Sequence, residues 1–398
     1  MAATLIDPYW RDWLDLLIRW LHVIAGIVWI GTSFYFVALD NHLGQPRERR
    51  DVDDGVAGES WEIHGGGFYR VSKWTVAPRE LPEPLHWFKW EAYTTWLSGF
   101  ALLVVLYYLD ADTYLIDPSV RDISPGAAVT LSLLGLGAAW VVYDVACRLI
   151  RIEALMVVFM LGLIAASAYA ASEVFSPRAA YLQVGAMLGT IMAGNVLLNI
   201  IPAHWELIRA KRRGEAPDPA PALEAKRRSV HNNYLTLPVV FTMISVHFPF
   251  TYGRERGWLV LVALVVIGAF VRHFFNLRHA GRNAWWIPVT AAIAVVALAI
   301  AIRPDEGGGG GTANPVSAAR AQAIVQQRCV PCHATEPSRE GFDSPPAGIV
   351  LETIEQMRAR AGRIEAQAVD SKAMPLGNVT GMTDDERAEL GAWIASVQ

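Results

Sequence analysis

The sequence is poor in charged residues and in cysteine. Asp, Glu, Lys and Arg together make up 18% of its 398 residues, whereas 53% are hydrophobic. This balance excludes an ordinary soluble globular protein and indicates several membrane-spanning helices in a lipid bilayer. Three cysteines are too few for a framework of disulfides. The net charge of -4 provides no basic surface, so no nucleic-acid partner is expected.

Eight apolar runs are long enough to cross a hydrocarbon layer of roughly 30 Å, which takes about 20 helical residues. We expect an all-α fold in which they form an eight-helix transmembrane bundle, at residues 14–39, 87–109, 126–146, 152–171, 179–201, 234–252, 257–276 and 284–302. Only residues 147–151 separate the third run from the fourth, so the count depends most on this turn. The first run is too long, and its surroundings too acidic, for a cleavable signal peptide, so we expect this span to be retained.

The composition changes after residue 303. Residues 304–314 include five consecutive glycines and predict a flexible linker. Residues 315–398 are polar enough to form a small soluble domain. The chain is therefore expected to consist of a membrane domain (1–303), the linker and a C-terminal domain (315–398).

The C-terminal domain contains the motif Cys329-Val330-Pro331-Cys332-His333. Two thiols at this spacing can each add to a vinyl group of haem, and the adjacent His can ligate the iron. We therefore predict one haem c, held covalently by Cys329 and Cys332, with His333 as an axial ligand. A chance CxxC, a zinc site and a redox pair are the alternatives.

The second axial ligand of the iron is predicted to be Met374. It precedes Pro375 in a loop beyond the motif, as in small class I-type cytochrome c domains. Met382 is the rival, and Met357 is disfavoured because it lies within a helical pattern. A thioether ligand raises the potential of the iron, which suits an electron acceptor.

Two helices are predicted on either side of the motif. The first covers residues 318–327, with an apolar stripe of Ala321, Ile324 and Val325. The second begins with a capping box, Thr383 and Glu386, and carries Leu390, Trp393, Ile394 and Val397 at helical spacing. This terminal helix is expected to cross the first one, as in a one-haem electron carrier.

Basic residues are concentrated on one side of the eight runs. Seventeen Lys and Arg residues fall in loops 41–85 and 203–233 and in the turns after the third and seventh runs, against four in the opposite connections. The positive-inside rule places the larger set in the cytoplasm. The protein would then lie in a bacterial inner membrane, with both termini and the C-terminal domain on the periplasmic side, where c-type haem is attached.

Several ionisable side chains lie inside or at the ends of the apolar runs, where they are costly and therefore functional candidates. They either ligate a haem within the membrane or bind an anionic substrate, and the alternative is that they cap or cross-link helices. We favour the structural role for His86, His204, His231 and His279, and a functional one for the deeper His22 and His247.

Seven segments of the chain resemble one family, the integral-membrane, cytochrome c-fused urate oxidases of bacteria, also called urate hydroxylases. In chain order they are RWLHVIAGIVWIGTSFYF, WEIHGGGFYRVSKW, LHWFKWEAYTTWLSGF, HNNYLTLPVVFTMISVHFPF, RHFFNLRHAG, CVPCH and AMP. The order of these segments, ending in a cytochrome, is more specific than any one of them. The Gly65–Gly67 run in the second segment lacks the preceding strand and following helix of a phosphate-binding loop, so it predicts a tight turn. An alternative that stays open is that this turn folds over a site.

The resemblance implies an oxidoreductase of purine catabolism that converts urate to 5-hydroxyisourate, with water supplying the new oxygen. Electrons would pass to the cytochrome domain and on to a downstream acceptor such as a soluble cytochrome or a terminal oxidase. No hydrogen peroxide would form, because dioxygen is not the direct acceptor.

Urate is a planar monoanion, so its site needs a cation, amide-type donors and an aromatic surface. Two groups of residues offer these, one around Arg19 and His22 and one around Arg272, His273 and Asn276. Arg19, Arg272 and Asn276 are the candidates for substrate binding. Neutral histidine is suited to removing protons, which makes His22, His247 and His273 the catalytic candidates.

The predicted haem c and a cytoplasmic urate site would lie too far apart for one electron-tunnelling step across roughly 30 Å of hydrocarbon. Either urate binds in the outer half of the bundle, near His22 and His247, or a second redox centre lies between the spans. A haem b with two histidine ligands is the candidate for such a centre.

The residues of the predicted spans do not by themselves identify a substrate, so two other functions remain open. One is a membrane dehydrogenase of another substrate, such as a quinol, that reduces the same cytochrome. The other is a transporter or assembly protein that carries an electron-transfer domain. Reduction of the haem by quinol and not by urate would select the first, and solute movement without haem reduction would select the second.

The haem motif gives the first testable prediction. Replacing both Cys329 and Cys332 by Ala should abolish covalent haem, because no thioether bond can form, while the membrane domain still inserts. Haem staining of denaturing gels and membrane fractionation measure the two properties. Covalent haem persisting in the double variant would contradict the assignment.

Overall fold

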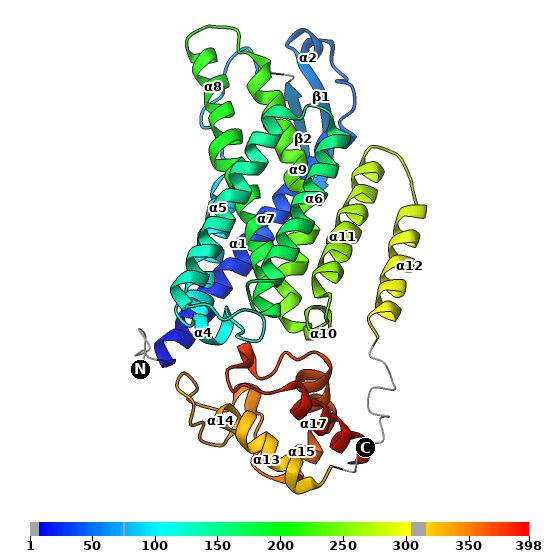
Figure 1. Ribbon diagram of the computed structural model, residues 1–398. Helices are drawn as coiled ribbons and strands as arrows, with labels where there is room; N and C mark the ends of the chain where they lie inside the picture. Colours follow the sequence, from blue (N-terminus) through cyan, green and yellow to red (C-terminus); the bar gives the residue numbers. More distant parts are fainter. Residues whose placement is uncertain (1–7, 75, 304–315, 398) are drawn as a thin grey trace.

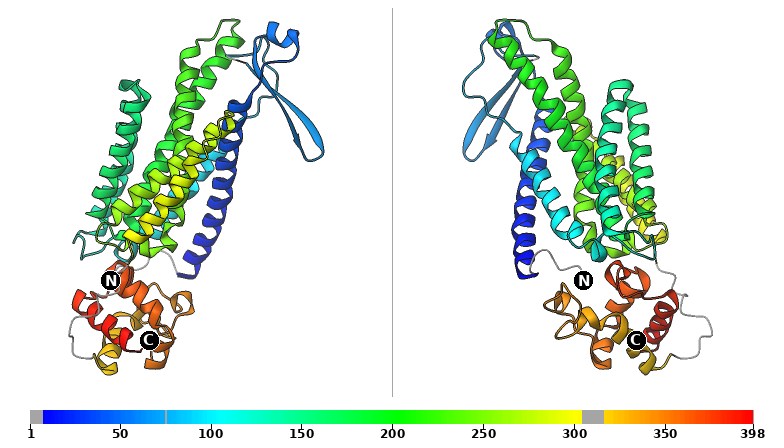
Figure 2. Two further views of the ribbon diagram at one scale, coloured as in Figure 1. Left: turned by 90° about the vertical axis from the view of Figure 1, so that its right-hand side faces the viewer. Right: turned by 60° about the vertical axis from the view of Figure 1, so that its left-hand side comes forward.

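The computed structural model describes residues 8–74, 76–303 and 316–397, so the predicted linker lies outside the described residues. A bundle of long helices forms most of the molecule, and a small helical domain built from residues 316–397 packs against one end of it (Figure 1). A β-hairpin projects from the opposite end of the bundle (Figure 2).

Each of the eight predicted runs contains a helix. These helices are α1 (Pro8–His42), α3 (Trp90–Leu103), α5 (Pro125–Leu149), α6 (Glu153–Ser172), α7 (Pro177–Asn195), α9 (Pro219–Ile244), α11 (Gly257–His279) and α12 (Trp286–Ala301). The third and fourth runs are separate helices, since residues 150–152 break them apart.

Five helices within the described residues are long and apolar enough to cross a membrane: Tyr9–His42, Pro125–Leu149, Glu153–Ser172, Pro177–Arg212 and Gly257–His279. The prediction of eight is therefore supported in part. Helix α12 is apolar but only 16 residues long, and α9 is polar over its first turns. Helix α3 has 14 residues and continues into the π-helical turn η1 (Val104–Tyr108).

Helix α7 lies at the centre of the bundle and α1 at its edge. Half of the most apolar stretch of the α7–α8 helix is buried, against 11% for α1. The apolar side chains that α1 exposes along its length are what a helix facing hydrocarbon presents. Serine caps start two of the inner helices, since Ser124 and Ser176 accept bonds from the backbone of α5 and α7.

The predicted loop at residues 203–233 is wrong, because most of it is helical. Helix α7 continues through a π-helical turn, η2 (Val196–Ile200), into α8 (Ile201–Arg212), and α9 begins at Pro219. Asp218 caps α9 by accepting a bond from the Ala220 amide at 2.9 Å. Hydropathy marks where the apolar run ends, but Lys, Arg, Glu and Ala are good helix formers and carry both helices further.

The all-α prediction is also wrong for one segment. Strands β1 (Val56–His64) and β2 (Gly67–Trp74) pair antiparallel, next to the short helix α2 (Arg49–Asp53). The predicted tight turn is confirmed, since Gly65 and Gly66 join the strands with φ of +57° and +82°. The alternation of apolar and polar residues that usually marks a strand is hidden in this hairpin, because the hairpin exposes apolar residues such as Ile63 and Phe68 to solvent.

An ion-pair cluster closes the base of the hairpin. Arg70 on β2 bonds to Glu59 on β1 at 2.9 Å and also to Asp51 on α2. The bond from Arg70 holds the pKa of the Glu59 carboxyl below its usual range. The hairpin extends away from the bundle (Figure 2), so it does not cover a site in this structure.

The C-terminal domain has its own core. Helices α13 (Ala318–Arg328), α14 (Val330–His333), α15 (Ile354–Ala359), α16 (Ala361–Ile364) and α17 (Asp384–Val397) surround it. The predicted apolar stripe on α13 is buried, and so are Leu390, Trp393 and Ile394 on α17, which packs against α13. The predicted capping box is confirmed by bonds of 3.2 and 2.9 Å between Thr383 and Glu386.

Glycines allow the C-terminal domain to meet the bundle at α4 (Ala111–Tyr114) and α10 (Pro249–Tyr252). A Cβ atom on Gly377 would lie 2.7 Å from the carbonyl oxygens of both Thr113 and Ile116. A Cβ on Gly253 would lie 1.8 Å from the Ser371 carbonyl oxygen. Only the backbone of glycine fits at these two contacts, so they fix how the domain is seated.

Gly377→Ala should therefore loosen this contact. Gly377 has φ of +55°, where Ala costs about 1 kcal/mol, and the new methyl group would also strike two carbonyl groups. We expect faster hydrogen exchange in residues 111–117 and 371–378. Gly341→Ala is the matched control, because Gly341 also has positive φ but no neighbour within 4 Å of its Cβ position. Equal exchange in the two variants would refute the role of Gly377.

Candidate functional site

The CxxCH segment forms a compact turn at the end of α13. Cys329 ends that helix, and the amides of Cys332 and His333 donate to its carbonyl at 3.1 and 2.9 Å. Both thiols are free. The turn thus places two thiols and an imidazole on one short stretch of backbone, as attachment of a haem requires.

The imidazole of His333 is oriented by the backbone. Its Nδ1 lies 2.9 Å from the Ile349 carbonyl oxygen, which fixes Nδ1 as the donor and leaves Nε2 as the atom able to bind a metal. Histidines that ligate metals are held in this way by a second hydrogen bond. The residues present therefore fit an axial ligand of haem iron.

The two thiols do not resemble a redox pair. Burial raises the pKa of Cys329 to about 12 and also raises the pKa of Cys332. Dithiol redox motifs work through thiolates with lowered pKa values. A zinc site is equally unsupported, because the described part of the chain has no cluster of three His, Cys, Asp or Glu side chains placed to hold a metal ion.

The three candidate methionines differ in burial. Met357 and Met382 are 0% and 3% exposed and form part of the domain core. Met374 is partly exposed and packs against the edge of that core. Its backbone is held at both ends, since its amide donates to Gln367 at 2.9 Å and Arg387 donates to its carbonyl at 2.7 Å. A thioether already packed in the core is not free to ligate, which favours Met374.

The bundle contains a cavity of about 310 Å³ between α1, α3, α7 and α9. The predicted site residues His22, His247 and Arg19 all line it. Nδ1 of His22 lies 3.0 Å from the Thr95 carbonyl oxygen and 3.1 Å from the Ser98 hydroxyl. His247 ends the 3₁₀ turn η3 (Ser245–His247), where α9 stops. The structure thus joins two histidines that are far apart in sequence.

Arg19 is not a free cation. Its guanidinium pairs with Asp15 at 2.6 Å, and its side chain is 46% exposed at the rim of the cavity. An arginine that is both paired and solvated has less to gain from an anionic ligand. The prediction that Arg19 contributes to substrate binding is therefore weakened in favour of Arg272.

Arg272 on α11 is buried among amide groups and is 2% exposed. Its Nε donates to Asn233 at 2.6 Å, and Asn233 donates in turn to Asn276 at 3.0 Å. The guanidinium stacks on Phe34, with its central carbon 3.7 Å from the ring centroid. Its Nη2 has no hydrogen-bond partner, and no carboxylate pairs with it among the residues that the structure describes.

His273 follows Arg272 and pairs with the residue that follows Asn233. The Tyr234 hydroxyl lies 2.7 Å from Nδ1 of His273, and the two rings are nearly parallel at 28°. A tyrosine–histidine pair of this kind can hold and pass a proton. The Tyr234–His273 pair and the Arg272–Asn233 pair both join α9 to α11, so the contact between these two helices positions both pairs.

The two groups of candidates are separate but adjacent. Arg272, His273 and Asn276 do not line the cavity that holds His22 and His247. The inner wall of that cavity includes Thr236, whose hydroxyl donates to the Asn233 carbonyl at 2.7 Å. The Arg272 group therefore begins one turn of α9 beyond the inner end of the cavity.

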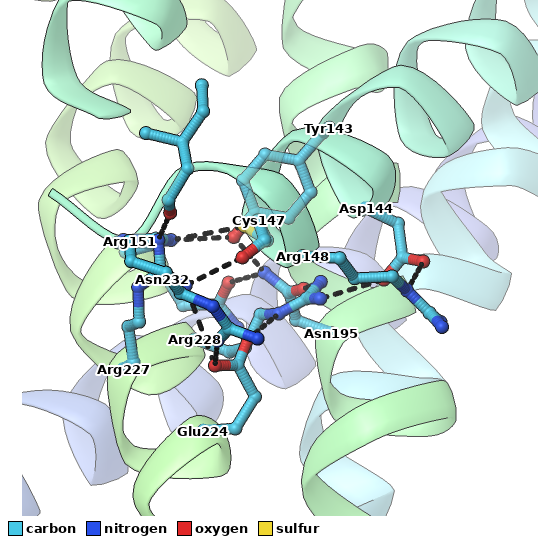
Figure 3. A network of polar contacts seen from close by, with 12 residues as sticks. Tyr143, Asp144, Cys147, Arg148, Arg151, Asn195, Glu224, Arg227, Arg228 and Asn232 are labelled. Atoms are coloured by element: carbon cyan, nitrogen blue, oxygen red, sulfur yellow. Dashed lines mark hydrogen bonds and ion pairs between the residues drawn. The ribbon is translucent and has the colours of Figure 1, made fainter. Parts of the chain in front are cut away.

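A second buried cation, Arg228, was missed from the sequence. Figure 3 shows it between Asp144 and Asn195, with bonds of 2.9 and 3.1 Å, and Glu224 accepts from its Nε at 3.0 Å. Asn195 also donates to Asn232 at 2.9 Å. Since two carboxylates neutralise Arg228, the network is a structural link between helices. Asp144, inside the third predicted span, was the signal for it.

The structural role expected for His231 is confirmed. Its Nδ1 lies 2.8 Å from the Tyr143 hydroxyl and its Nε2 lies 3.3 Å from Glu153, so it joins α9 to α5 and α6. Sequence reasoning did not single out three of the residues around Arg272 and His273: Phe34, Asn233 and Tyr234. For Asn233, its place at the start of an apolar run, beside a second asparagine, was the available signal.

Comparison with known proteins gives one match. The family model described as urate oxidase N-terminal matches residues 8–303, which is most of the chain and includes both groups of membrane residues. No curated protein matches, and no solved structure matches. The class I-type cytochrome c domain therefore stays a prediction that rests on the motif and on the orientation of His333.

Met374→Ala should leave haem attached and lower its midpoint potential, because a thioether ligand raises the potential of the iron. A spectroelectrochemical titration of the full chain measures this. Met382→Ala is the comparison variant: it removes a core side chain and should lower stability, with little effect on potential. A potential that shifts in Met382→Ala and not in Met374→Ala would transfer the ligand role to Met382.

Proposed function

The chain belongs to the urate oxidase N-terminal family, and from this premise we propose that it oxidises urate to 5-hydroxyisourate at the membrane. The urate monoanion and water give neutral 5-hydroxyisourate, two electrons and one proton, with a new bond between carbon and the water oxygen. The electrons leave through the C-terminal domain to a downstream carrier, so hydrogen peroxide is not a product.

We propose that all eight long helices span the membrane of a bacterial cell, with the C-terminal domain outside. Two features support this. Helix α1 starts at the end of the bundle where the C-terminal domain packs (Figure 1), as an even number of spans requires. The hairpin with its flanking segments, helix α8 and the first turns of α9 lie at the other end (Figure 2), and these parts carry 13 of the 17 basic residues counted on the cytoplasmic side.

The observation that carries the urate site is the unpaired charge of Arg272. A guanidinium buried without a carboxylate in a membrane domain is costly unless a ligand supplies the negative charge. Urate supplies it, and Phe34, on which the guanidinium stacks, adds an aromatic wall beside the charge. The unsatisfied Nη2 of Arg272 and the amide group of Asn276 would fix its orientation, while Asn233 holds both of these side chains in place.

Proton removal is assigned to the pair formed by Tyr234 and His273. A neutral imidazole is the base suited to deprotonating an attacking water near neutral pH. Its Nδ1 contact with the tyrosine hydroxyl, at 2.7 Å, holds the ring, and when Nδ1 donates to the hydroxyl oxygen, Nε2 is the basic atom. His273 directly follows Arg272, so the proposed base and the proposed anion site lie on the same turn of α11.

The electron outlet is assigned to the C-terminal domain. Cys329 and Cys332 would hold a haem c covalently, and His333 and Met374 would ligate its iron. When bound, this group takes up one electron at a time. The protein's part is to orient His333 through Ile349 and to hold the Met374 loop through Arg387. It also seats that loop against the bundle through Gly377.

Arg272→Gln tests the urate site. The variant keeps a donor but loses the charge, and a hydrogen bond to a charged group contributes about 1.5–3 kcal/mol, so urate affinity should fall about tenfold to hundredfold. Stopped-flow reduction of the c-type haem by urate without oxygen, over a range of urate concentrations, measures this. Reduction by dithionite should be unchanged.

The matched control is Arg212→Gln. Arg212 ends α8, is 59% exposed and pairs with Glu83 at 3.1 Å, far from the proposed site. It should behave as the unmodified protein. An Arg272→Gln protein that folds and is reduced by urate with unchanged affinity would refute the urate site, and absence of any urate-dependent reduction in the unmodified protein would refute the function.

A further inference from the structure

We propose that the cavity between α1, α3, α7 and α9 binds a second, non-covalent haem, ligated by His22 and His247. The site is argued from the cavity itself. Its use as an electron relay rests on the proposed function, because it would connect the urate site to the C-terminal domain.

The first argument is distance. Arg272 lies 15 residues beyond the first residue of α11, the end that meets α10 and the C-terminal domain. At 1.5 Å per residue this is about 22 Å of helix, before the C-terminal domain itself is entered. That separation is too long for efficient electron transfer in one step, and the cavity lies between the two sites.

The second argument is the state of the two histidines. The Nδ1 contact with the Thr95 carbonyl fixes the His22 ring and leaves Nε2 free, the arrangement found for histidines that ligate metals. His247 stands exposed at the mouth of the cavity, and no hydrogen bond holds its ring among the described residues. One imidazole is oriented and the other is free to turn toward the cavity, so both are available as axial ligands.

The third argument is shape. Along α1 the lining runs from Arg19 to Ile30, about 16 Å of helix. Glycines from three helices line the cavity: Gly26, Gly99, Gly185 and Gly189. A Cβ on Gly99 would lie 2.8 Å from the His22 ring, so only glycine leaves that ring in place. Nothing lies within 4 Å of the Cβ position of Gly189, where the missing side chain leaves open space.

The fourth argument is charge. The walls are mostly apolar, as a porphyrin ring requires, and the cavity lining contains two arginines and no carboxylate. Arg178 is near the start of α7, at the end of the bundle that meets the C-terminal domain, and its Nε is buried without a hydrogen-bond partner. A propionate group on a haem would match Arg178, whereas Arg19 is already paired with Asp15.

Arg178 also connects the cavity to the C-terminal domain. It lines a small crevice formed with Asp117 on the bundle side and Lys372 and Gly377 on the domain side. These last two residues belong to the loop that carries Met374. A haem with its propionates at Arg178 would therefore point toward the ligand loop of the c-type haem.

The electron balance is simple. Each of the two electrons from urate reduces the ferric iron of the second haem to ferrous, which returns to ferric by reducing the c-type haem. The c-type haem is reoxidised by a downstream carrier such as a soluble cytochrome or a terminal oxidase. The one proton that is released stays at the urate site, on the imidazole of His273.

The test is haem analysis of the purified full chain. Acidified acetone removes non-covalent haem and leaves the thioether-bound haem on the protein. Pyridine haemochrome spectra should show one extractable haem b for each covalent haem c, and the intact protein should give the low-spin electron paramagnetic resonance signal of iron with two imidazole ligands. The absence of extractable haem would overturn the proposal.

Variants assign the ligands. His22→Leu and His247→Leu should each lose the extractable haem and its low-spin signal while keeping the covalent haem, which reports that the chain has folded and reached its compartment. His204→Leu is the matched control, because His204 lies on α8, contacts Trp87 and does not line the cavity. Full retention of the extractable haem in both test variants would overturn the assignment, as would a quinone or urate recovered from the cavity in its place.

The outcome separates this proposal from the function. Extractable haem in a protein that urate cannot reduce would keep the site and reject urate oxidation. Reduction of the covalent haem by urate in a protein without extractable haem would keep the function and reject the site.

Discussion

A positive charge without a counterion is the constraint on which the inner half of the bundle depends. Arg228 and Arg272 are both buried, yet two carboxylates neutralise Arg228 whereas Arg272 has only amide and aromatic neighbours. Burying an unneutralised guanidinium opposes folding, so the helices around it must be held by other contacts. The Arg228 network supplies such contacts between α5, α7 and α9, and this leaves Arg272 available to an anion.

The functional groups lie in sequence along the bundle. The Arg272 group is followed by the cavity of His22 and His247, then by Arg178, and then by the loop that carries Met374. Each step is a direct contact: the Thr236 hydroxyl links the first two, and Arg178 borders both the cavity and the crevice beneath the loop. The proposed oxidation site at one end and the proposed electron outlet at the other are therefore joined by one continuous set of packed residues.

The sequence predicted those features that depend on neighbouring residues. The CxxCH turn, the stripe on α13 and the Thr383 capping box are set by local spacing, and the structure has the helices and the cap where they were expected. The hairpin was missed because its strands expose apolar side chains such as Ile63 and Phe68 to solvent, which hides the alternation that marks a strand. The pairing of Arg228 with Asn195 was missed because 33 residues separate them, and the same applies to Arg272 and Asn233, which are 39 apart.

Docking of the C-terminal domain decides whether the proposed electron path is complete. Gly377 and Ser371 flank Met374 and lie in tight contact with the bundle, at the carbonyl groups of Thr113 and Ile116 and at Gly253. The part of the domain that faces the membrane domain is thus the loop predicted to ligate iron. Because the two domains share one chain, this contact is intramolecular and forms at a high effective concentration. A separate carrier that had to diffuse to its partner would need a charged docking surface. The C-terminal domain, the proposed carrier, is instead seated against the bundle by close backbone contacts at Gly377 and Gly253.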